Sequence, residues 1–333
     1  MKRFKPEWEE QSAILMAYPH TATDWGVYLE EAQECFSNII DALSHYQEVV
    51  VCVHPNDTKS QDYLAKMSQV QIALIETNDT WARDFGPLCV ETNGIALYLD
   101  FIFNAWGGKY QAHLDNAISS KLAQKGLLKH PLRFVNFVLE GGSVESDGEG
   151  SILTTTSCLL NPDRNPNLDQ AQITGVLKQE LGAQQILWLD VQPLAGDDTG
   201  GHIDTLARFL DPNTIAYVSC SNRNDPHYDD LKNMEAQLRH LRNMEGEHYE
   251  LLPLPLPSPK FYQNTRLPAT YANFLWVNNN NQKVLFVPTY DDSADNKVLK
   301  ILEDHTGVEV VGVDCSVLIR QKGSLHCATM QLY

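Results

Sequence analysis

Short apolar runs bounded by turn-forming residues are the feature that most limits how this chain of 333 residues can fold. Each run is four to six residues long and rich in Val, Ile, Leu or aromatic residues, which is typical of buried strands. Six of them stand at residues 49–53, 96–101, 185–189, 214–218, 284–287 and 308–313.

Longer stretches with apolar residues at helical spacing lie between some of these runs. From Ala32 to Leu43, apolar residues recur every three or four positions. Strands and helices therefore alternate irregularly from end to end, which predicts an α/β fold. No linker interrupts this rhythm, so we expect residues 1–333 to form a single domain. The predicted helices cover residues 30–46, 170–181, 229–242 and 293–306.

Two segments depart from the general composition. Residues 251–259 are rich in Leu and Pro, which predicts an irregular segment. Residues 278–281 are four consecutive Asn, a residue that tolerates left-handed backbone well. This run predicts the tip of a hairpin.

The chain is strongly acidic, with a formal net charge of -18. Nucleic acids and anionic membranes bind clustered positive charge, so neither is an expected partner. A small cationic substrate suits this charge, although solubility alone would explain it. No apolar run approaches the ~18 residues of a membrane span. The basic start is followed by no apolar signal segment, so we expect a cytoplasmic protein.

Seven cysteines are present, at irregular spacing and without a CxxC pair. This pattern argues against a disulfide framework and against a structural zinc site. Cys327 differs from the others because it stands among Gly, Ser and His. On a strand, the adjacent His326 would face the opposite way. His202 is therefore the expected partner of Cys327.

Carboxylates and tryptophans gather in two loop-like segments. Residues 78–87 contain Asp79, Trp81 and Asp84, and residues 104–110 contain Trp106 among glycines. The first segment could be a turn with Asp79 as a helix N-cap and a surface Asp–Arg pair. The second could be a turn anchored by its Trp. Either segment could equally line a pocket.

Two further segments place acid–base groups beside glycines. Glu140 closes an apolar run and is followed by two Gly, which let a ligand approach the backbone. Residues 195–205 contain Asp198, His202 and Asp204. On a strand, His202 and Asp204 would share one face and point into one pocket. The alternatives are an exposed turn at Glu140 and a solvated loop at 195–205.

Taken together, these segments resemble the agmatine deiminase family, a branch of the guanidine-modifying superfamily that includes peptidylarginine deiminases. The chain departs from the family pattern at Glu10-Gln11, where Pro-His is familiar, and at Lys322, where Gly is frequent. The matching motifs are Pro-Glu-Trp-Glu at 6–9, Asp-x-Trp-x-Arg-Asp-x-Gly-Pro at 79–87, Asn-x-Trp-Gly-Gly at 104–108, Glu-Gly-Gly at 140–142, Thr-x-Gly-His-x-Asp at 199–204, Tyr-x-Asn-Phe at 271–274 and Gly-x-x-His-Cys at 323–327.

The resemblance implies a five-bladed propeller of ββαβ units, called a pentein. It also implies hydrolysis of agmatine to N-carbamoylputrescine and ammonia in putrescine biosynthesis, without metal or organic cofactor. Relatives often form homodimers. The implied catalytic residues are Cys327 as nucleophile, His202 as acid and base, and Glu140 as their support; the implied substrate-binding residues are Asp84, Asp204, Trp81, Trp106 and Asp198.

Other functions remain possible for the same residues. The nearest is a deiminase of peptidyl or free arginine, and a second is an amidinotransferase. A non-catalytic polyamine- or arginine-binding protein would need no nucleophile, and a cysteine peptidase would need no paired aspartates. The nature of the substrate's tail is left open at this level.

Overall fold

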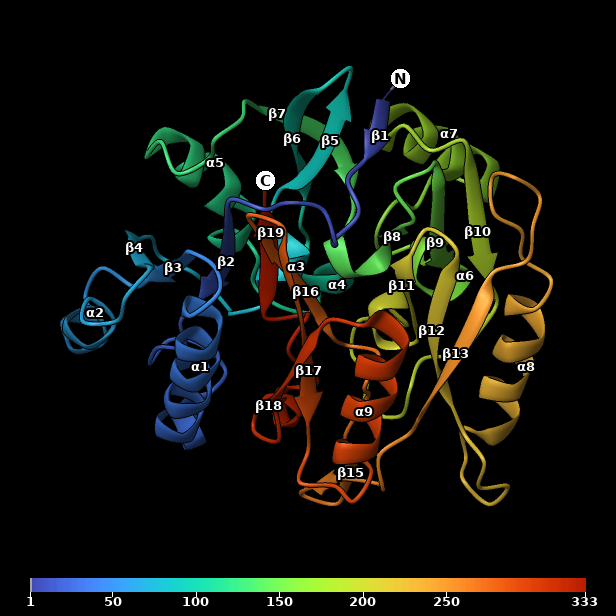
Figure 1. Ribbon diagram of the computed structural model, residues 1–333. Helices are drawn as coiled ribbons and strands as arrows, with labels where there is room; N and C mark the ends of the chain where they lie inside the picture. Colours follow the sequence, from blue (N-terminus) through green and yellow to red (C-terminus); the bar gives the residue numbers. More distant parts are fainter. Residues whose placement is uncertain (1) are drawn as a thin grey trace.

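The computed structural model describes residues 2–333 and has the mixed α/β fold that the sequence predicts (Figure 1). Over these residues the strands form five sheets of three or four strands and one two-stranded hairpin. Each of the five sheets has an antiparallel strand pair beside a parallel pair. A connection containing a helix joins each parallel pair, as parallel pairing requires. This mixture of short and long connections explains the irregular alternation.

The two ends of the chain share one sheet. β19 (Thr329–Leu332) pairs antiparallel with β2 (Ala13–Ala17), so the C-terminal strand lies beside one of the first. The same sheet continues with β3 (Val49–Val53) and β4 (Val70–Leu74), both parallel to β2. The other strands are, sheet by sheet, β1 (Lys2–Phe4), β5 (Leu88–Thr92), β6 (Ile95–Ile102) and β7 (Leu132–Val138); β8 (Glu145–Ser146), β9 (Ser151–Thr155) and β10 (Gln185–Leu189); β11 (Ala207–Asp211), β12 (Thr214–Ser219) and β13 (Glu250–Pro255); β16 (Leu275–Asn279), β17 (Gln282–Thr289) and β18 (Glu309–Asp314); and the hairpin β14 (Phe261–Tyr262) and β15 (Thr265–Arg266).

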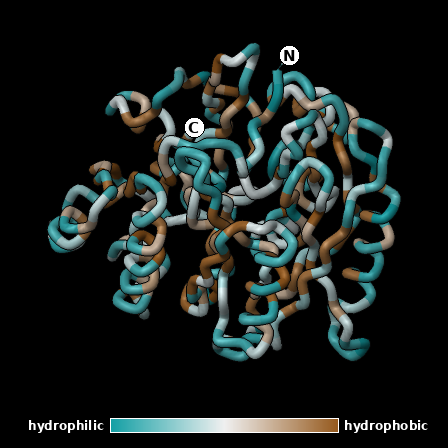
Figure 2. Tube along the Cα trace, in the orientation of Figure 1, coloured by the Kyte–Doolittle hydropathy of each residue, from teal (hydrophilic) through white to brown (hydrophobic). Residues whose placement is uncertain are grey.

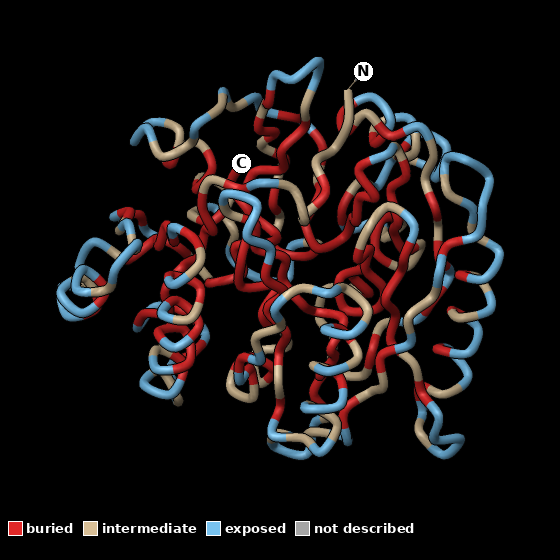
Figure 3. The backbone as a smooth tube through the Cα atoms, viewed as in Figure 1, coloured by how far each residue is buried: buried red, intermediate tan, exposed pale blue. Residues whose placement is uncertain are grey.

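The longer helices lie outside the sheets, with buried faces inward and exposed faces toward solvent (Figures 2 and 3). α7 (Gln170–Leu181) covers the predicted range because both ends are fixed, by a capping box at Asp169 and a left-handed Gly182. The other helices are α1 (Leu29–Ser44), α2 (Thr58–Leu64), α3 (Ala82–Phe85), α4 (Ala105–Gly108), α5 (Ile118–Gln124), α6 (Thr156–Leu159), α8 (Tyr228–Leu238) and α9 (Asp295–Thr306), with the 3-10 turns η1 (Gly26–Tyr28), η2 (Asp115–Ala117), η3 (Gly141–Ser143), η4 (Ile203–Thr205) and η5 (Leu318–Gln321).

Most predicted elements are confirmed, and the exceptions have local causes. α8 ends earlier than predicted because Arg242 forms a β-bridge with His248. The prediction of an irregular segment at 251–259 is wrong in its first half, because β13 pairs in parallel with β12 there. The Asn run is a hairpin tip as predicted, with left-handed backbone at Asn280 and Asn281.

Charged side chains are buried inside the molecule and tie its segments together. Arg208 in β11 is fully buried and contacts Glu145 of β8 and Glu7 near the N-terminus. Its guanidinium also donates to the backbone carbonyl of Phe274, next to β16. Buried charges are retained only when paired in this way. Over residues 2–333, none of the helices has both the length and the apolar character to cross a bilayer.

Candidate active site

Cys327 lies in the loop between η5 and β19, and its thiol is held by two side chains. Asn273 Nδ2 is 3.3 Å from Cys327 Sγ, and Asp204 Oδ2 is 3.6 Å from it. Burial raises the pKa of the thiol well above its ordinary value, and the charges of Asp204 and Asp84 raise it further. These effects favour the neutral thiol over the thiolate at Cys327. Asn273 belongs to the Tyr-x-Asn-Phe motif, but its contact with sulfur was not foreseen.

Asp84 and Asp204 reach the thiol from different elements. Asp84 in α3 accepts hydrogen bonds from Gly142 N at 3.1 Å and from Trp106 Nε1 at 2.9 Å. Burial raises the pKa of Asp84 to about 6, and the charge of Asp204 contributes to the rise. Asp204, in η4, has one oxygen bound by His326, while its buried Oδ1 has no hydrogen-bond partner in the described chain. A carboxylate oxygen without a donor can accept one from a ligand.

His202 sits at the N-terminus of η4, fully buried. Burial lowers the pKa of its ring, but Asp84, Cys158 and Glu140 outweigh burial and raise it to about 10. Its Nδ1 lies 3.5 Å from Asp84 Oδ1. The ring is therefore an imidazolium at neutral pH. The ring makes no hydrogen bond to Cys327, its expected partner; the two groups instead border the same pair of aspartates.

Gly142 is what allows these groups to converge. A β-carbon at this position would lie 2.6 Å from His202 Nδ1, 2.9 Å from Asp84 Oδ1 and 3.0 Å from Asp204 Oδ2. The prediction that His202 and Asp204 share a strand face is wrong, because Asp204 lies in a 3-10 turn that begins after His202. Backbone curvature, and not strand alternation, brings both side chains to Gly142.

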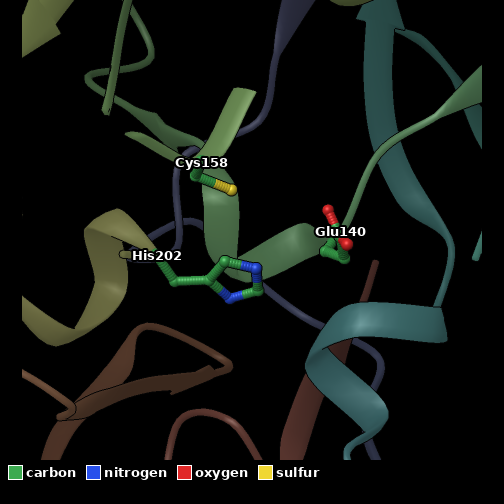
Figure 4. A group of neighbouring side chains, drawn as sticks. All are labelled: Glu140, Cys158 and His202. Carbon is green, nitrogen blue, oxygen red and sulfur yellow. The ribbon is translucent and has the colours of Figure 1, made fainter. Parts of the chain in front are cut away.

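Glu140 precedes η3 and is held by a residue that sequence reasoning missed. Arg164 Nε donates to both carboxylate oxygens of Glu140 at 2.9 Å, and both side chains are fully buried. Glu140, Cys158 and His202 also offer ligand atoms that lie within 4.8 Å of one another, a grouping that could hold a metal ion (Figure 4). A buried carboxylate needs a partner of opposite charge, and this requirement of Glu140 was the one signal in the sequence that could have predicted an arginine beside it.

His326 is a second residue that sequence reasoning missed. Its Nδ1 lies 2.7 Å from Asp204 Oδ2 and its Nε2 lies 2.6 Å from Glu7 Oε1. Arg83 is also buried here and pairs with Glu7 at 3.0 Å, so the alternative of a surface Asp–Arg pair is wrong. His326 and Cys327 lie in a turn and not on a strand, and the His326 ring holds the same oxygen of Asp204 that lies 3.6 Å from Cys327 Sγ.

Trp81 and Trp106 wall a narrow cavity of about 40 Å³. Trp81 is pressed against Gly323, where a β-carbon would come within 2.2 Å of the indole. Asp79 is at the wall and is not a helix N-cap, because Trp81 holds that position before α3. The lining consists of Asp24, Asp79, Trp81, Asp84, Trp106, Tyr110, Asp198, Thr199, Gln321, Lys322, Gly323 and Cys327.

Asp198 stands at the mouth of this cavity with two lysines. Its carboxylate lies 2.8 Å from Lys322 Nζ and 3.2 Å from Lys109 Nζ, and Tyr110 also donates to it. Burial raises the pKa of Asp198, but the bonds from Lys322 and Tyr110 outweigh burial and lower it to about 2. Asp198 is thus an anion at the entrance, already shared between two ammonium groups.

Known proteins of one family are similar to this chain over nearly its whole length. The model of the family "Porphyromonas-type peptidyl-arginine deiminase" matches residues 3–332. A curated protein of Legionella pneumophila strain Philadelphia 1, named "Putative agmatine deiminase", is 31% identical, covering 98% of this chain and 93% of its own. A crystal structure described as "a putative peptidyl-arginine deiminase" is 51% identical, with a TM-score of 0.97, covering 100% of this chain and 98% of its own.

A second solved structure is an agmatine deiminase of C. jejuni with substrate bound. It is 41% identical to this chain, with a TM-score of 0.93, and the match covers 99% of this chain and 96% of the other. The family resemblance read from the sequence is confirmed by these matches. This chain belongs to the family of Porphyromonas-type peptidyl-arginine deiminases.

Proposed function

We propose that this protein is an agmatine deiminase, which hydrolyses the guanidinium group of agmatine to N-carbamoylputrescine and ammonia. The observation that carries the proposal is Asp204 Oδ1, a buried carboxylate oxygen without a partner, next to the thiol of Cys327. Asp84 is a second buried carboxylate on the same site. Two carboxylates suit a planar cation with several N–H donors.

Substrate binding activates the nucleophile in this scheme. Burial, and then the charges of Asp204 and Asp84, hold the pKa of Cys327 high before the substrate binds. A guanidinium bound between them cancels this negative potential and stabilises the thiolate. The bound guanidinium of the substrate therefore promotes ionisation of the Cys327 thiol, which then attacks it.

The reaction then runs through a covalent intermediate. Cys327 Sγ forms a bond to the guanidinium carbon, and the C–N bond to one terminal nitrogen breaks as the His202 imidazolium gives that nitrogen a proton. Ammonia leaves, and an amidino-thioether remains on Cys327. His202 next takes a proton from water, whose oxygen bonds to the same carbon. The C–S bond breaks and releases the ureido product.

Glu140 supports His202 by keeping its pKa high, in addition to Asp84 and Cys158. Arg164 holds Glu140 in place through two hydrogen bonds of 2.9 Å. Trp81 and Trp106 give the substrate two aromatic walls, which suit a cation and its methylenes. None of these roles calls for a metal or an organic cofactor.

The cavity mouth favours a tail that ends in an ammonium. Asp198, Asp24 and Asp79 all line the cavity. Asp198 can exchange a lysine ammonium for the substrate's own. Glu9 is not among the residues that line the cavity, and it pairs with Lys5 at 3.3 Å. Agmatine, with a guanidinium at one end and an ammonium at the other, fits this distribution of charge.

The second candidate is a deiminase of free or peptidyl arginine. One observation favours it: Lys322 lines the cavity and could pair with a carboxylate of free arginine. The two candidates share every residue around Cys327 and differ only at the mouth. Substrate comparison therefore separates them.

The decisive experiment measures ammonia release from agmatine, free arginine and a blocked arginine peptide. We expect agmatine to have the highest kcat/KM and Cys327→Ser to release none. Cys220→Ser is the matched control, because Cys220 lies outside the cavity and should keep full activity. A Cys327→Ser variant with normal activity would remove the nucleophile from the proposal. Binding without ammonia release by the wild type would indicate a non-catalytic binding protein.

Acid quenching of the wild type during turnover tests the intermediate. Mass spectrometry should find an amidino group on the peptide that contains Cys327. Asp84→Asn should bind agmatine weakly and form no adduct, because one of the two carboxylates is neutralised. An adduct on another cysteine would contradict the assignment.

We also propose that residues 1–333 form one catalytic domain in which the five sheets are the blades of a pentein propeller. The support is that each sheet repeats the same order of an antiparallel pair and a helical crossover. N-carbamoylputrescine is a precursor of putrescine, which places the reaction in putrescine synthesis. The homodimer and the cytoplasmic location stay predictions from the sequence.

A further inference from the structure

A second thiol, that of Cys158, lies beside His202 and makes no bond to the substrate in the reaction above. Cys158 is in α6, directly after β9, and is fully buried. One ligand atom from each of Cys158, His202 and Glu140 lies within 4.8 Å of the other two. Figure 4 shows the three side chains converging from separate elements.

The ring of His202 is the member of this cluster that is not held by a hydrogen bond of good geometry. Within the described chain, neither of its nitrogens meets the geometry of a hydrogen bond, although the side chain is fully buried and the thiol of Cys158 lies close enough to raise the pKa of the ring. Nδ1 lies on the side of Asp84, 3.5 Å from Oδ1. Figure 4 shows the other nitrogen turned toward the side where Cys158 and Glu140 lie. A buried polar atom left unpaired is costly, and a metal ion at this nitrogen would take the place of the proton that the imidazolium carries there.

We propose that Cys158, His202 and Glu140 form a site for a divalent cation of borderline softness, with Zn²⁺ as the best match. Thiolate, imidazole and carboxylate are the three ligand types that zinc takes in proteins. Zn–S bonds of about 2.3 Å and Zn–N bonds of about 2.0 Å let one ion bridge atoms too far apart to hydrogen-bond.

The charges around the three ligands are compatible with such an ion. A thiolate and a carboxylate together neutralise the two charges of Zn²⁺. Arg164 holds Glu140 through Nε, which orients the carboxylate as the outer partner of a metal ligand does. The charge of Asp84, which lies next to His202 on the other side, also acts on Arg164 and favours its charged form.

A similar group of side chains elsewhere does not have this property. Glu7, Glu145 and His326 also offer ligand atoms within 4.8 Å of one another. However, both ring nitrogens of His326 already contact carboxylates, and Glu7 is paired with Arg208. The free ring nitrogen is therefore what distinguishes the cluster of Cys158, His202 and Glu140.

An ion at this site would inhibit the enzyme by occupying His202. The inhibition rests on the proposed role of His202 as acid and base. The binding of the metal does not depend on that role. Binding and inhibition can therefore be tested separately.

Binding is tested with Co²⁺ alone, because a cobalt–thiolate bond gives a near-ultraviolet charge-transfer band. We expect the band in the wild type and in Cys327→Ser, and at least a tenfold weaker affinity in Cys158→Ser. A band that survives in Cys158→Ser but disappears in Cys327→Ser would place the metal on the nucleophile and overturn the proposal. The absence of a band in the wild type would overturn it as well.

A second measurement does not depend on Cys158→Ser folding correctly. In zinc-loaded Cys327→Ser, X-ray absorption should show a sulfur ligand at about 2.3 Å from zinc. A zinc ion with only nitrogen and oxygen ligands would refute the site.

Inhibition is measured as the zinc concentration that halves ammonia release, relative to each variant's own rate without metal. This concentration should be at least tenfold higher in Cys158→Ser than in the wild type. Zinc that binds with a sulfur ligand in Cys327→Ser but leaves wild-type turnover unchanged would support the metal site and count against the proposed role of His202.

Discussion

His326 Nδ1 lies 2.7 Å from Asp204 Oδ2, and this contact fixes the carboxylate that stands beside Cys327. With His326 holding one oxygen, the other is left free to accept a donor. The residue before the nucleophile therefore acts on the site through Asp204. Glu7, on the far side of the ring, connects this contact to the start of the chain.

Replacing His326 should therefore impair catalysis without touching the thiol. In His326→Ala, Asp204 and Glu7 lose a shared buried partner, so kcat/KM for agmatine should fall at least tenfold, which is about 1.4 kcal/mol. The melting temperature should also fall. His240→Ala, at an exposed position, is the control and should change neither quantity. Equal activity of the two variants would show that Asp204 needs no such support.

Gly142→Ala should abolish activity while leaving the protein folded. The new β-carbon would meet His202 Nδ1 at 2.6 Å and Asp84 Oδ1 at 2.9 Å, so at least one of these groups must move. Gly175→Ala is the matched control, because a β-carbon there meets nothing within 4 Å and the residue lies in α7. That variant should be fully active and more stable by about 0.5–1 kcal/mol. Circular dichroism and steady-state rates decide the comparison.

The pH dependence of kcat/KM should be bell-shaped. Asp84 has a pKa of about 6 and must be ionised to bind a cation, so activity should rise as pH increases through about 6. His202 has a pKa of about 10 and must be protonated to release ammonia, so activity should fall above about pH 10.

Glu140→Gln should move both limbs of this profile to lower pH, because the charge of Glu140 raises the pKa of both Asp84 and His202. Glu303→Gln, on the exposed face of α9, should leave the profile in place. An unchanged profile in Glu140→Gln would show that Glu140 does not set these pKa values.

Asn273→Asp should slow the chemistry of Cys327 through charge alone. The substitution keeps the shape of the side chain but puts a carboxylate within about 3.3 Å of the sulfur. A third negative charge raises the pKa of the thiol further, so both ammonia release and alkylation of Cys327 by iodoacetamide should slow at least tenfold. Asn280→Asp, at the exposed hairpin tip, is the control. An alkylation rate equal to the wild type would indicate that Asn273 does not act on the thiol.

Lys322→Met should lower KM for agmatine. Lys322 competes with an incoming ammonium for Asp198, at a distance of 2.8 Å between Nζ and Oδ2. Without this ammonium, Asp198 is more available, so KM should fall a few-fold with little change in kcat. Asp198→Asn should do the opposite. Lys283→Met is an exposed control on β17. A rise in KM for Lys322→Met would favour a substrate whose tail carries a carboxylate.

The sequence by itself determined the class of the fold and most of its elements. β3, β10 and α7 follow their predicted ranges because each is encoded locally, by an apolar run or by caps. The candidate residues that line the site were also visible as Asp, Glu, His and Trp set among glycines. The family motifs gave their order along the chain.

Only the tertiary structure decided how these residues work together. His202 and Asp204 meet at Gly142 through a 3-10 turn, which strand alternation did not predict. Three further residues are placed by contacts between positions 24 to 122 residues apart: His326, Asn273 and Arg164. Cys158 is placed by its burial beside His202. Such contacts depend on how separate sheets pack, and no local pattern records them. The pKa values of Cys327 and His202 have the same origin, because burial and opposing charges set them and both are properties of the folded interior.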